Sequence, residues 1–326
     1  MAIDVGLLGK FLNDQLKAYN SEYYDIPEDE LWGALGLYVP SIGDLPFGAK
    51  EIQSFRKTTI GEGAVSDGRA YDIPMVDFGI EANGVKTNLV LASAEWSLDQ
   101  LAEAQFAVSS GRGASFNLIE AKADAVKTAI ERRIHRLVYA GMPETGFGGL
   151  FNSGSLTPVD ATGDGNLYGS TTPLTPSALT SWFQGIIATF KTSSKLAYSS
   201  IIAYVDDSLF TALCAPIADN TGDTPYMRLT SQERGRFIKD IIPITELDPV
   251  TLAANGIISN AATRGRMILG DFGNPKSVKR QFRATDRTQP FMKDTGFHWG
   301  ITGWAATSEV NFLVPERFEY VNFAHS

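Results

Sequence analysis

Cysteine is almost absent from this sequence, since Cys214 is the only one among 326 residues. A single cysteine excludes an intrachain disulfide and a metal site made of several cysteines. We predict that Cys214 is a small, buried, hydrophobic side chain. Histidine is also scarce, and the three histidines form no His-Glu-x-x-His pair; no Gly-x-Ser-x-Gly or paired-cysteine motif is present either. A Ser–His–Asp set whose members lie far apart in the sequence stays open.

Long apolar runs are missing too, and no stretch approaches the roughly 18 apolar residues of a membrane-spanning helix. The N-terminus lacks the basic region of a signal peptide and carries Asp4. We therefore expect a soluble protein that is made in a cytoplasm and begins at Met1 with no piece removed. Lysine and arginine number 28 against 37 acidic residues, and the net charge of −9 argues against a dedicated nucleic-acid binder. Incidental contact through local basic patches stays open.

Three short runs resemble ligand-binding loops but lack essential parts. Gly111–Phe116 has no third glycine and no preceding strand, which favours a kink between helices over a phosphate site. Gly146–Gly149 lacks the Lys-Ser or Lys-Thr of a phosphate loop. Asp219–Asp223 lacks the alternating ligands and closing glutamate of a calcium loop, which favours a polar loop over a metal site. The sequence thus predicts no cofactor and no metal.

The histidines have structural interpretations. His135 lies among arginines on a charged helix face, where we expect it to be solvated. His298 lies beside aromatic residues and is expected to pack against them, and His325 is one residue from the end, where we expect mobility.

The length suggests two domains or one large one. Residues 1–50 carry apolar residues at helical spacing and then aromatics among breakers, which predicts an arm lying along another surface.

Residues 51–95 predict a projecting β-hairpin. A strand at 52–58 is polar on both faces and leads to a tip with glycines and Asp-Gly. Return strands are expected at 72–80 and 86–91, with a second turn at 82–84.

A helical region opens at Trp96 with the capping box Ser97–Gln100 and pauses after Ser109. A second box at Asn117 begins a long amphipathic helix that Gly141 ends. At 1.5 Å per residue this helix is roughly 36 Å long. The chain beyond predicts a loop at 153–175, a helix at 176–191, strands at 200–205, 237–244 and 266–270, a short helix capped by Asp206-Asp207, and closing strands within 310–323.

Basic residues gather in two clusters, one on the long helix and one, from Lys276 to Arg287, on a predicted strand pair. They could pair with the chain's own acids or, as charges on extended elements often do, set the register of an interface. Together with basic residues of the hairpin, the candidate intersubunit or DNA-facing contacts are Arg56, Lys57, Arg69, Arg132, Arg133, Arg136, Lys279, Arg280 and Arg283.

The order of these parts resembles the major capsid proteins of tailed bacteriophages, which share the Hong Kong 97-type fold. The local match runs from Trp96–Leu101 through the long helix to Gly148–Asn152, which is similar to the Gly-Leu-x-Asn turn after the spine helix of that family. Ile301–Trp304 and Tyr320–Phe323 resemble its closing strands. The order of parts covers nearly the whole chain, and the residue-level match covers a smaller part.

The resemblance implies an α+β fold of the Hong Kong 97 type. Its parts would be an N-terminal arm at 1–50, an extended β-hairpin loop at 51–95, a peripheral domain with the spine helix at 96–195 that is closed by 276–326, and an inserted α/β axial domain at 196–275. The implied role is structural and non-enzymatic: a major capsid subunit that self-assembles into hexamers and pentamers of an icosahedral shell enclosing viral double-stranded DNA.

The implied partners are copies of the chain itself, a scaffold, decoration and portal protein, and packaged DNA held without sequence readout, with no membrane. Because only about 50 residues precede the hairpin, the scaffold would be a separate protein or absent. The implied location is the virion capsid, assembled in the bacterial host cytoplasm. Two alternatives stay open: an encapsulin-type compartment shell, and a soluble enzyme in which His298 meets carboxylates in a pocket.

Overall fold

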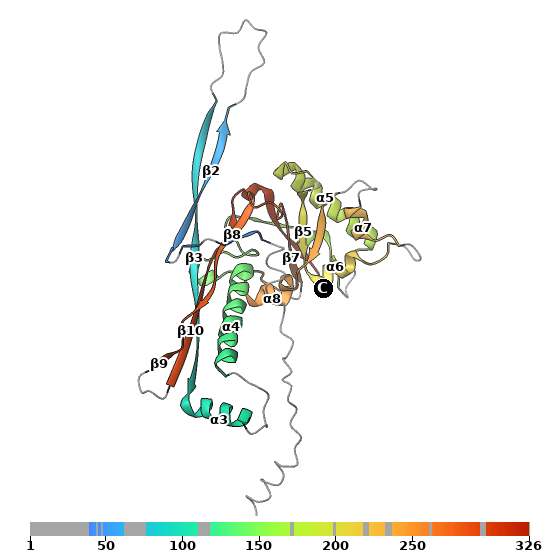
Figure 1. Cartoon of the computed structure of the whole chain (residues 1–326). Helices are drawn as coiled ribbons and strands as arrows, with labels where there is room; N and C mark the ends of the chain where they lie inside the picture. Colours follow the sequence, from blue (N-terminus) through green and yellow to red (C-terminus); the bar gives the residue numbers. More distant parts are fainter. Residues whose placement is uncertain are drawn as a thin grey trace, which may run out of the picture. The chain divides into compact units, whose positions relative to one another are not determined.

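The computed structural model in Figure 1 describes most of the chain. The chain divides into two compact units. The first unit contains described residues within 91–132 and 285–305, and the second contains those within 39–90, 133–284 and 306–325. The described residues are 39–43, 45–46, 48–61, 76–109, 118–169, 173–197, 200–217, 222–231, 237–260, 263–293 and 298–325. The predictions for the arm before residue 39, the hairpin tip with Arg69, the kink at Ser110–Asn117 and most of Asp219–Asp223 lie outside them.

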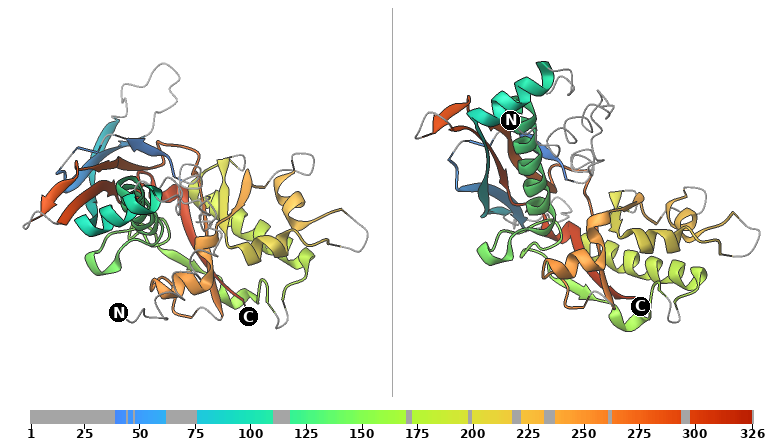
Figure 2. Two further views of the ribbon diagram at one scale, coloured as in Figure 1. Left: turned by 60° about the horizontal axis from the view of Figure 1, so that its bottom comes forward. Right: turned by 90° about the horizontal axis from the view of Figure 1, so that it is seen from below.

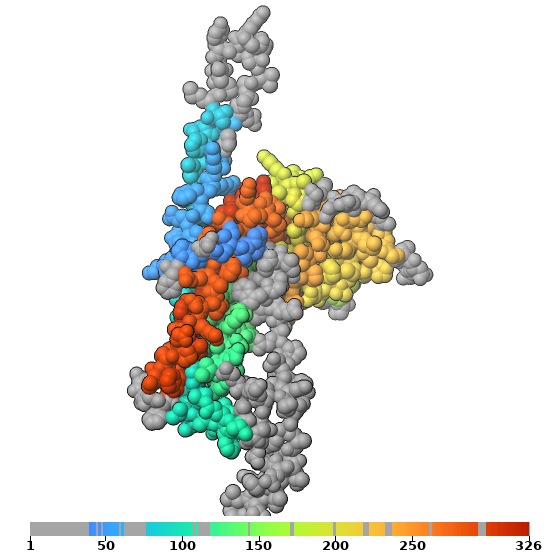
Figure 3. All heavy atoms as spheres, in the orientation of Figure 1, coloured from blue at the N-terminus to red at the C-terminus, as the bar shows by residue number. Residues whose placement is uncertain are grey.

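The predicted hairpin is built from β2 (Glu51–Ile60) and β3 (Asp77–Ser97). The two strands pair antiparallel from Glu51 opposite Lys86 to Ile60 opposite Asp77. We call β2 together with residues 77–86 of β3 the ribbon (Figures 1 and 3). The second turn predicted at 82–84 is wrong, because β3 runs through these residues without interruption. A Cβ on Gly84 would collide with the Glu51 carboxylate, so this glycine makes room for a neighbouring side chain across the strands.

The ribbon belongs to a seven-stranded sheet with the path β1-β8-β10-β3-β2, in which β11 also pairs with β8 and β9 with β10. The remaining strands of this sheet are β1 (Ser41–Gly43), β8 (Val278–Arg287), β9 (Phe291–Lys293), β10 (His298–Ser308) and β11 (Asn311–Phe312).

The two predicted helices are confirmed as α3 (Leu98–Ser109) and α4 (Leu118–Ala140). The capping box of α3 is formed in both directions: the Gln100 amide donates to Ser97 Oγ at 3.2 Å, and the Ser97 amide donates to Gln100 Oε1 at 3.4 Å. Trp96 belongs to the end of β3 and is buried. None of the helices in the described part of the chain is long and apolar enough to cross a membrane.

Within the first unit, α4 packs closely against β10 at Gly303. A Cβ at this glycine would come within 2.7 Å of Val126 Cγ1 and 2.9 Å of Ile130 Cδ1. A side chain on β10 would therefore push the helix away, and the glycine permits the close approach.

The second unit contains a five-stranded sheet in the order β4-β12-β7-β5-β6 (Figure 2). Its strands are β4 (Pro158–Asp160), β5 (Ile202–Val205), β6 (Asp240–Pro243), β7 (Arg264–Gly270) and β12 (Phe318–Ala324). The helices beside it are α5 (Pro176–Ser194), α6 (Asp207–Leu213), α7 (Pro225–Thr230) and α8 (Pro249–Ala254). Short 3₁₀ turns lie at η1 (Pro143–Thr145), η2 (Thr162–Asp164), η5 (Thr245–Leu247) and η6 (Pro315–Arg317).

The core of this sheet is formed by α5 together with the central strands. Phe183, Ile187 and Phe190 of α5 share one apolar cluster with Val205 of β5 and Phe323 of β12. The cluster therefore takes residues from both sides of the predicted boundaries at 195/196 and 275/276. The predicted cap of α6 is confirmed, because the Leu209 amide donates to Asp206 Oδ2 at 3.1 Å.

Candidate assembly surfaces

The glycine-rich run after α4 folds back over the C-terminus of the helix. Gly141 has a φ of +70° and donates to the Leu137 carbonyl at 3.0 Å, as a helix-ending glycine does. The Leu150 and Phe151 amides then donate to the carbonyls of Val138 and Tyr139 at 2.7 and 3.0 Å. The run thus satisfies carbonyls at the helix end that would otherwise lack partners.

Close backbone packing makes glycine necessary at position 149. A Cβ there would collide with the Gly141 nitrogen and the Tyr139 carbonyl oxygen. The turn is tied to the five-stranded sheet by Arg266, whose Nη1 donates to the Phe151 carbonyl at 2.8 Å while its Nε donates to Asn322 Oδ1 at 2.8 Å.

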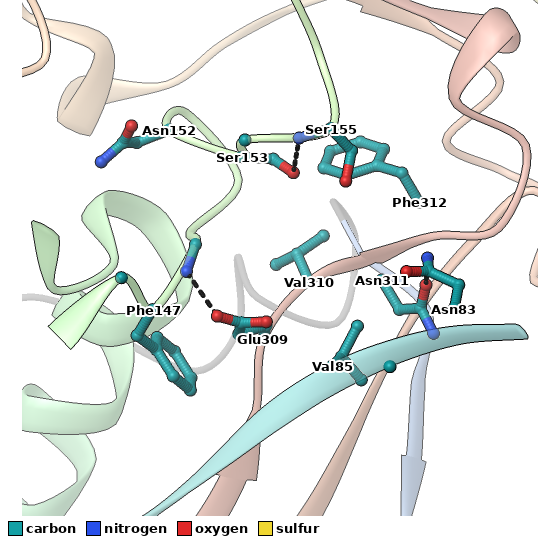
Figure 4. A pocket seen from close by; sticks show the side chains of 14 residues that line it. Asn83, Val85, Phe147, Asn152, Ser153, Ser155, Glu309, Val310, Asn311 and Phe312 are labelled. Carbon is teal, nitrogen blue, oxygen red and sulfur yellow. Dashed lines mark hydrogen bonds between the residues drawn. The ribbon is translucent and has the colours of Figure 1, made fainter. Parts of the chain in front are cut away.

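Glu309 links the base of the ribbon to this turn (Figure 4). Its Oε1 accepts from the Gly148 amide at 2.8 Å, and its Oε2 accepts from the Lys86 amide at 3.0 Å. The Lys86 ammonium reaches the other side of the turn and donates to the Thr145 carbonyl at 2.9 Å. The three segments surround a hollow of about 400 Å³ whose walls include Asn83 and Phe147. No motif marked Glu309 in the sequence, because its partners lie far away along the chain.

The ribbon has two chemically different faces. Paired residues of an antiparallel ladder point to the same side, so the register fixes both sets. The inner face is held by the chain's own C-terminal segment: Asn311 Nδ2 donates to Ser54 Oγ at 3.0 Å, Asn83 Nδ2 donates to Asn311 Oδ1 at 3.3 Å, and Arg56 Nη2 lies 2.6 Å from Glu316 Oε1. Burial raises the pKa of Glu316, but the hydrogen bond and charge of Arg56 outweigh it and lower that pKa below its ordinary value.

The outer face of the ribbon exposes large apolar side chains. Phe55 is 71% exposed, Ile80 63% and Phe78 53%. Lys57 lies among them, with its ammonium 4.5 Å from the centre of the Phe78 ring. Within the described residues, this ribbon therefore combines a face anchored to its own subunit with a face that exposes large apolar side chains.

The other basic candidates of the ribbon and α4 occupy different environments. Arg132 and Arg133 are exposed on α4, whereas exposed Arg136 donates from Nη2 to Asn255 Oδ1 at 3.0 Å. Beside the ribbon, a second hollow of about 470 Å³ is lined by Arg56, Lys57 and Lys276, among others.

On β8, Lys279 and Arg283 are half-buried, but Arg280 is only 1% exposed. The prediction of Arg280 as an intersubunit or DNA contact is therefore wrong. Its Nε donates to Ser41 Oγ at 3.0 Å and its guanidinium lies 5.2 Å from the Phe282 ring centre, while burial lowers its pKa to about 10. Alternate residues of a strand point to opposite sides, so Arg280 faces away from Lys279 and Arg283, which lie together on the other side of β8.

Two further single-residue predictions are wrong. His135 is buried and lies with Nε2 2.9 Å from Glu246 Oε1, instead of in solvent. Cys214 is exposed, because it follows α6 at its C-cap, outside the buried side formed by Leu209 and Leu213.

The structure also differs from our expectations for the other two histidines, His298 and His325. His325 stacks on Tyr168 with ring centres 4.8 Å apart instead of being mobile, and His298 is exposed at the first residue of β10 instead of packed. Within the described residues, no three His, Cys, Asp or Glu side chains are placed to hold a metal ion.

The fold is that of solved capsid proteins and of an encapsulin, over nearly their full length. The capsid protein of Myoviridae phage XM1 is 12% identical with a TM-score of 0.69, and the match covers 96% of this chain and 98% of that one. The native GTA particle capsid gives 13% identity, a TM-score of 0.60 and 99% coverage of both chains. The SrpI encapsulin of Synechococcus elongatus gives 11% identity, a TM-score of 0.52, and coverage of 98% and 95%. At these identities the likeness shows the fold, and the predicted α+β, Hong Kong 97-type fold is confirmed.

No curated protein matches the sequence. The family of major capsid proteins, however, matches residues 61–234, which is more than half of the 326 residues. The chain therefore belongs to the major capsid protein family, and its role is that of a structural subunit of a capsid shell.

Proposed function

We propose that this chain forms the hexamers and pentamers of an icosahedral shell that encloses double-stranded viral DNA. The observation that carries the proposal is the outer face of the ribbon, where Phe55, Phe78 and Ile80 are each more than half exposed. Large apolar side chains gathered on one side of a projecting element mark an interaction site, since water solvates them poorly. In a capsid family, the partner that fits such a surface best is another copy of the same chain.

We also propose a division of the chain into the parts of a capsid subunit. Residues 1–50 would form an arm, 51–95 the extended loop, 96–195 with 276–326 the peripheral domain, and 196–275 the axial domain. A separate scaffold, a decoration protein and a portal protein are proposed as further partners, with assembly in the bacterial host cytoplasm.

The DNA would meet exposed arginines without sequence readout. Arg132 and Arg133 are exposed on α4, and exposed Lys127, 3.9 Å from Glu131, lies on the same helix. Contacts of this kind neutralise phosphates and release counterions, which makes binding dependent on salt and independent of sequence.

Electron microscopy of the purified chain, combined with nuclease treatment, tests the proposal. The expected result is closed shells with five- and six-fold capsomers, and DNA that resists nuclease when the shells come from infected cells. A chain that stays monomeric over a wide range of concentration and ionic strength contradicts it.

The likeness to the SrpI encapsulin favours a second candidate, a protein compartment shell of the same fold. The same preparation separates the two, since a compartment would enclose a cargo protein and no nuclease-resistant DNA. The soluble-enzyme alternative called for a pocket in which His298 meets carboxylates, and His298 is exposed at the start of β10.

A further inference from the structure

The C-terminal end of the chain lies at one end of the five-stranded sheet. The last residue of β12, Ala324, pairs with Arg264, the first residue of β7. Strand β5 also runs antiparallel to β7, so its last residue points to the same end of the sheet. Asp206, directly after β5, and His325, directly after β12, are therefore brought to one end of the sheet by strands that are far apart in the sequence.

Three buried polar atoms meet at this end of the sheet. They are the Tyr168 hydroxyl, Asp206 Oδ1 and His325 Nε2, and within the described residues none of them makes a hydrogen bond of good geometry. The rings of Tyr168 and His325 stack with centres 4.8 Å apart and planes 12° from parallel. The Tyr168 hydroxyl also lies close enough to the Asp206 carboxylate to lower the pKa of that carboxyl. The three side chains thus form one cluster.

The carboxylate of Asp206 is only partly compensated in this cluster. The side chain is 2% exposed, and burial raises the pKa of Asp206. The Tyr168 hydroxyl, the Leu209 amide and the charge of His325 lower that pKa, but the balance leaves it above its ordinary value. Burial and the charge of Asp206 raise the pKa of Tyr168 well above its ordinary value, so the phenol keeps its proton. The proton that can leave the cluster as the pH rises is therefore not that of the phenol.

The other charged groups at this end of the sheet are engaged elsewhere. Asp248 acts on Tyr168 from the start of α8, where its Oδ2 accepts from backbone amides of that helix. Arg266 of β7 donates to the turn after α4 and to β12, and Arg264 is exposed. Among the described residues, the base whose charge acts on Asp206 is His325.

We propose that Tyr168, Asp206 and His325 form a pH-sensitive latch that holds the C-terminal end of the chain on the sheet. While Asp206 holds its proton, the cluster is neutral and closed. When that proton passes to the solvent, a buried charge remains, and hydrating it favours an open end. Lifting His325 opens the cluster most readily, because this residue is half-buried and is the last but one. The charge of a protonated His325 offsets the carboxylate, so its loss acts in the same direction.

The direction of the pH dependence follows from the raised pKa of Asp206. An acid whose pKa is raised by folding contributes its stability below the unfolded value of 3.8, and this contribution is lost as the pH rises through the folded value. The latch is therefore closed in acid and opens as the pH rises. All three residues lie within one subunit, so the latch does not depend on assembly of the shell.

Hydrogen–deuterium exchange of the whole chain tests the latch. The reporters are the His325 amide, which donates to the Thr263 carbonyl at 3.0 Å, and the Leu167 amide, which donates to the Ala324 carbonyl at 2.9 Å. After correction for the intrinsic effect of pH on exchange, their protection in the wild type should fall several-fold between about pH 4 and pH 8. Asp206→Asn should abolish this fall, because asparagine caps a helix as well as aspartate does and carries no charge.

The matched control is Asp207→Asn, which removes the charge of the next residue, an exposed one, and should keep the wild-type fall. Protection at Val321, within β12, is the internal reference and should not follow the pH. Tyr168→Phe removes a hydroxyl that favours the charged carboxyl, so it should enlarge the fall, and it keeps the test open if Asp206→Asn fails to fold. The latch is overturned if wild-type protection does not change with pH, if the fall persists in Asp206→Asn, or if Tyr168→Phe leaves it unchanged.

Discussion

His135 on α4 and Glu246 in η5 form a hydrogen-bonded pair that joins the C-terminal part of the helix to the segment before α8. The Nε2–Oε1 distance is 2.9 Å, and the His135 ring meets the edge of Tyr139 with centres 4.7 Å apart. One residue further along, Arg136 donates to Asn255 just after α8. Two consecutive side chains of α4 therefore hold residues 246 and 255, so this part of the helix and the region around α8 are expected to move as one body.

Glu246 should make the stability of the subunit depend on acidity. Burial raises the pKa of Glu246, but the hydrogen bond and charge of His135 lower it below the ordinary value of 4.5. A carboxyl whose pKa is lowered by folding stabilises the protein above its unfolded pKa, and this contribution is lost as the pH falls through the folded value. Glu246→Gln should therefore flatten the loss of stability below about pH 4.5.

The measurement is urea unfolding of the unassembled subunit between pH 3.5 and 7, for the wild type and Glu246→Gln. Arg136→Gln is the control, because it removes a neighbouring contact without a titrating acid. Identical pH profiles for the wild type and Glu246→Gln would contradict the assignment.

Gly149→Ala should destabilise the turn after α4 strongly. Its Cβ would meet the Gly141 nitrogen and the Tyr139 carbonyl, both of which are backbone atoms with little freedom to move. We expect a loss of about 2–4 kcal/mol in the free energy of unfolding. Gly154→Ala is a matched control five positions further on, since a Cβ there meets nothing within 4 Å, and it should change stability by less than about 1 kcal/mol. Equal effects of the two substitutions in denaturant unfolding would show that the turn can relax.

Glu309→Ala should loosen the base of the ribbon. The substitution removes the acceptor of the Lys86 and Gly148 amides at once, and the net contribution of each such hydrogen bond is about 0.5–1.5 kcal/mol. Hydrogen–deuterium exchange should rise at residues 84–88 and 146–149. Exchange in β5 and β7 is the internal reference and should stay unchanged. Unaltered protection at Lys86 and Gly148 would mean that Glu309 does not hold these segments.

The features predicted well from sequence depend on local chemistry. The ends of α3 and α4 were predicted closely because a capping box and a glycine act within one turn of helix. The continuity of β3 through 82–84 was missed, because it depends on pairing with β2 across the hairpin. Asn83-Gly84 predicts a turn by itself, but here both residues pair with β2 and remain extended.

The missed side chains have partners that are distant in the sequence. The burial of His135 depends on Glu246, which lies on another element, and that of Arg280 depends on Ser41 and on the alternation of β8. Charge counting placed Arg280 on a surface because it treated neighbours in the sequence as neighbours in space. The residues next to Glu309 in the sequence do not indicate its role. Its carboxylate accepts hydrogen bonds from the backbone amides of Lys86 and Gly148, which are far away in the sequence.

The contrast between Arg133 and Arg280 gives a test of the proposed DNA contact. Arg133 is exposed on α4, whereas Arg280 is buried against Ser41 and Phe282. Each phosphate contact contributes about 0.9 to the slope of log affinity against log salt concentration, so Arg133→Gln should lower that slope by about 1 for duplex DNA of any sequence. Arg280→Met should lower the unfolding temperature, because it removes the hydrogen bond to Ser41, and should leave the slope unchanged. A slope that falls equally in both variants would point to an indirect effect of folding, and a slope unchanged in Arg133→Gln would remove this residue from the DNA-facing surface.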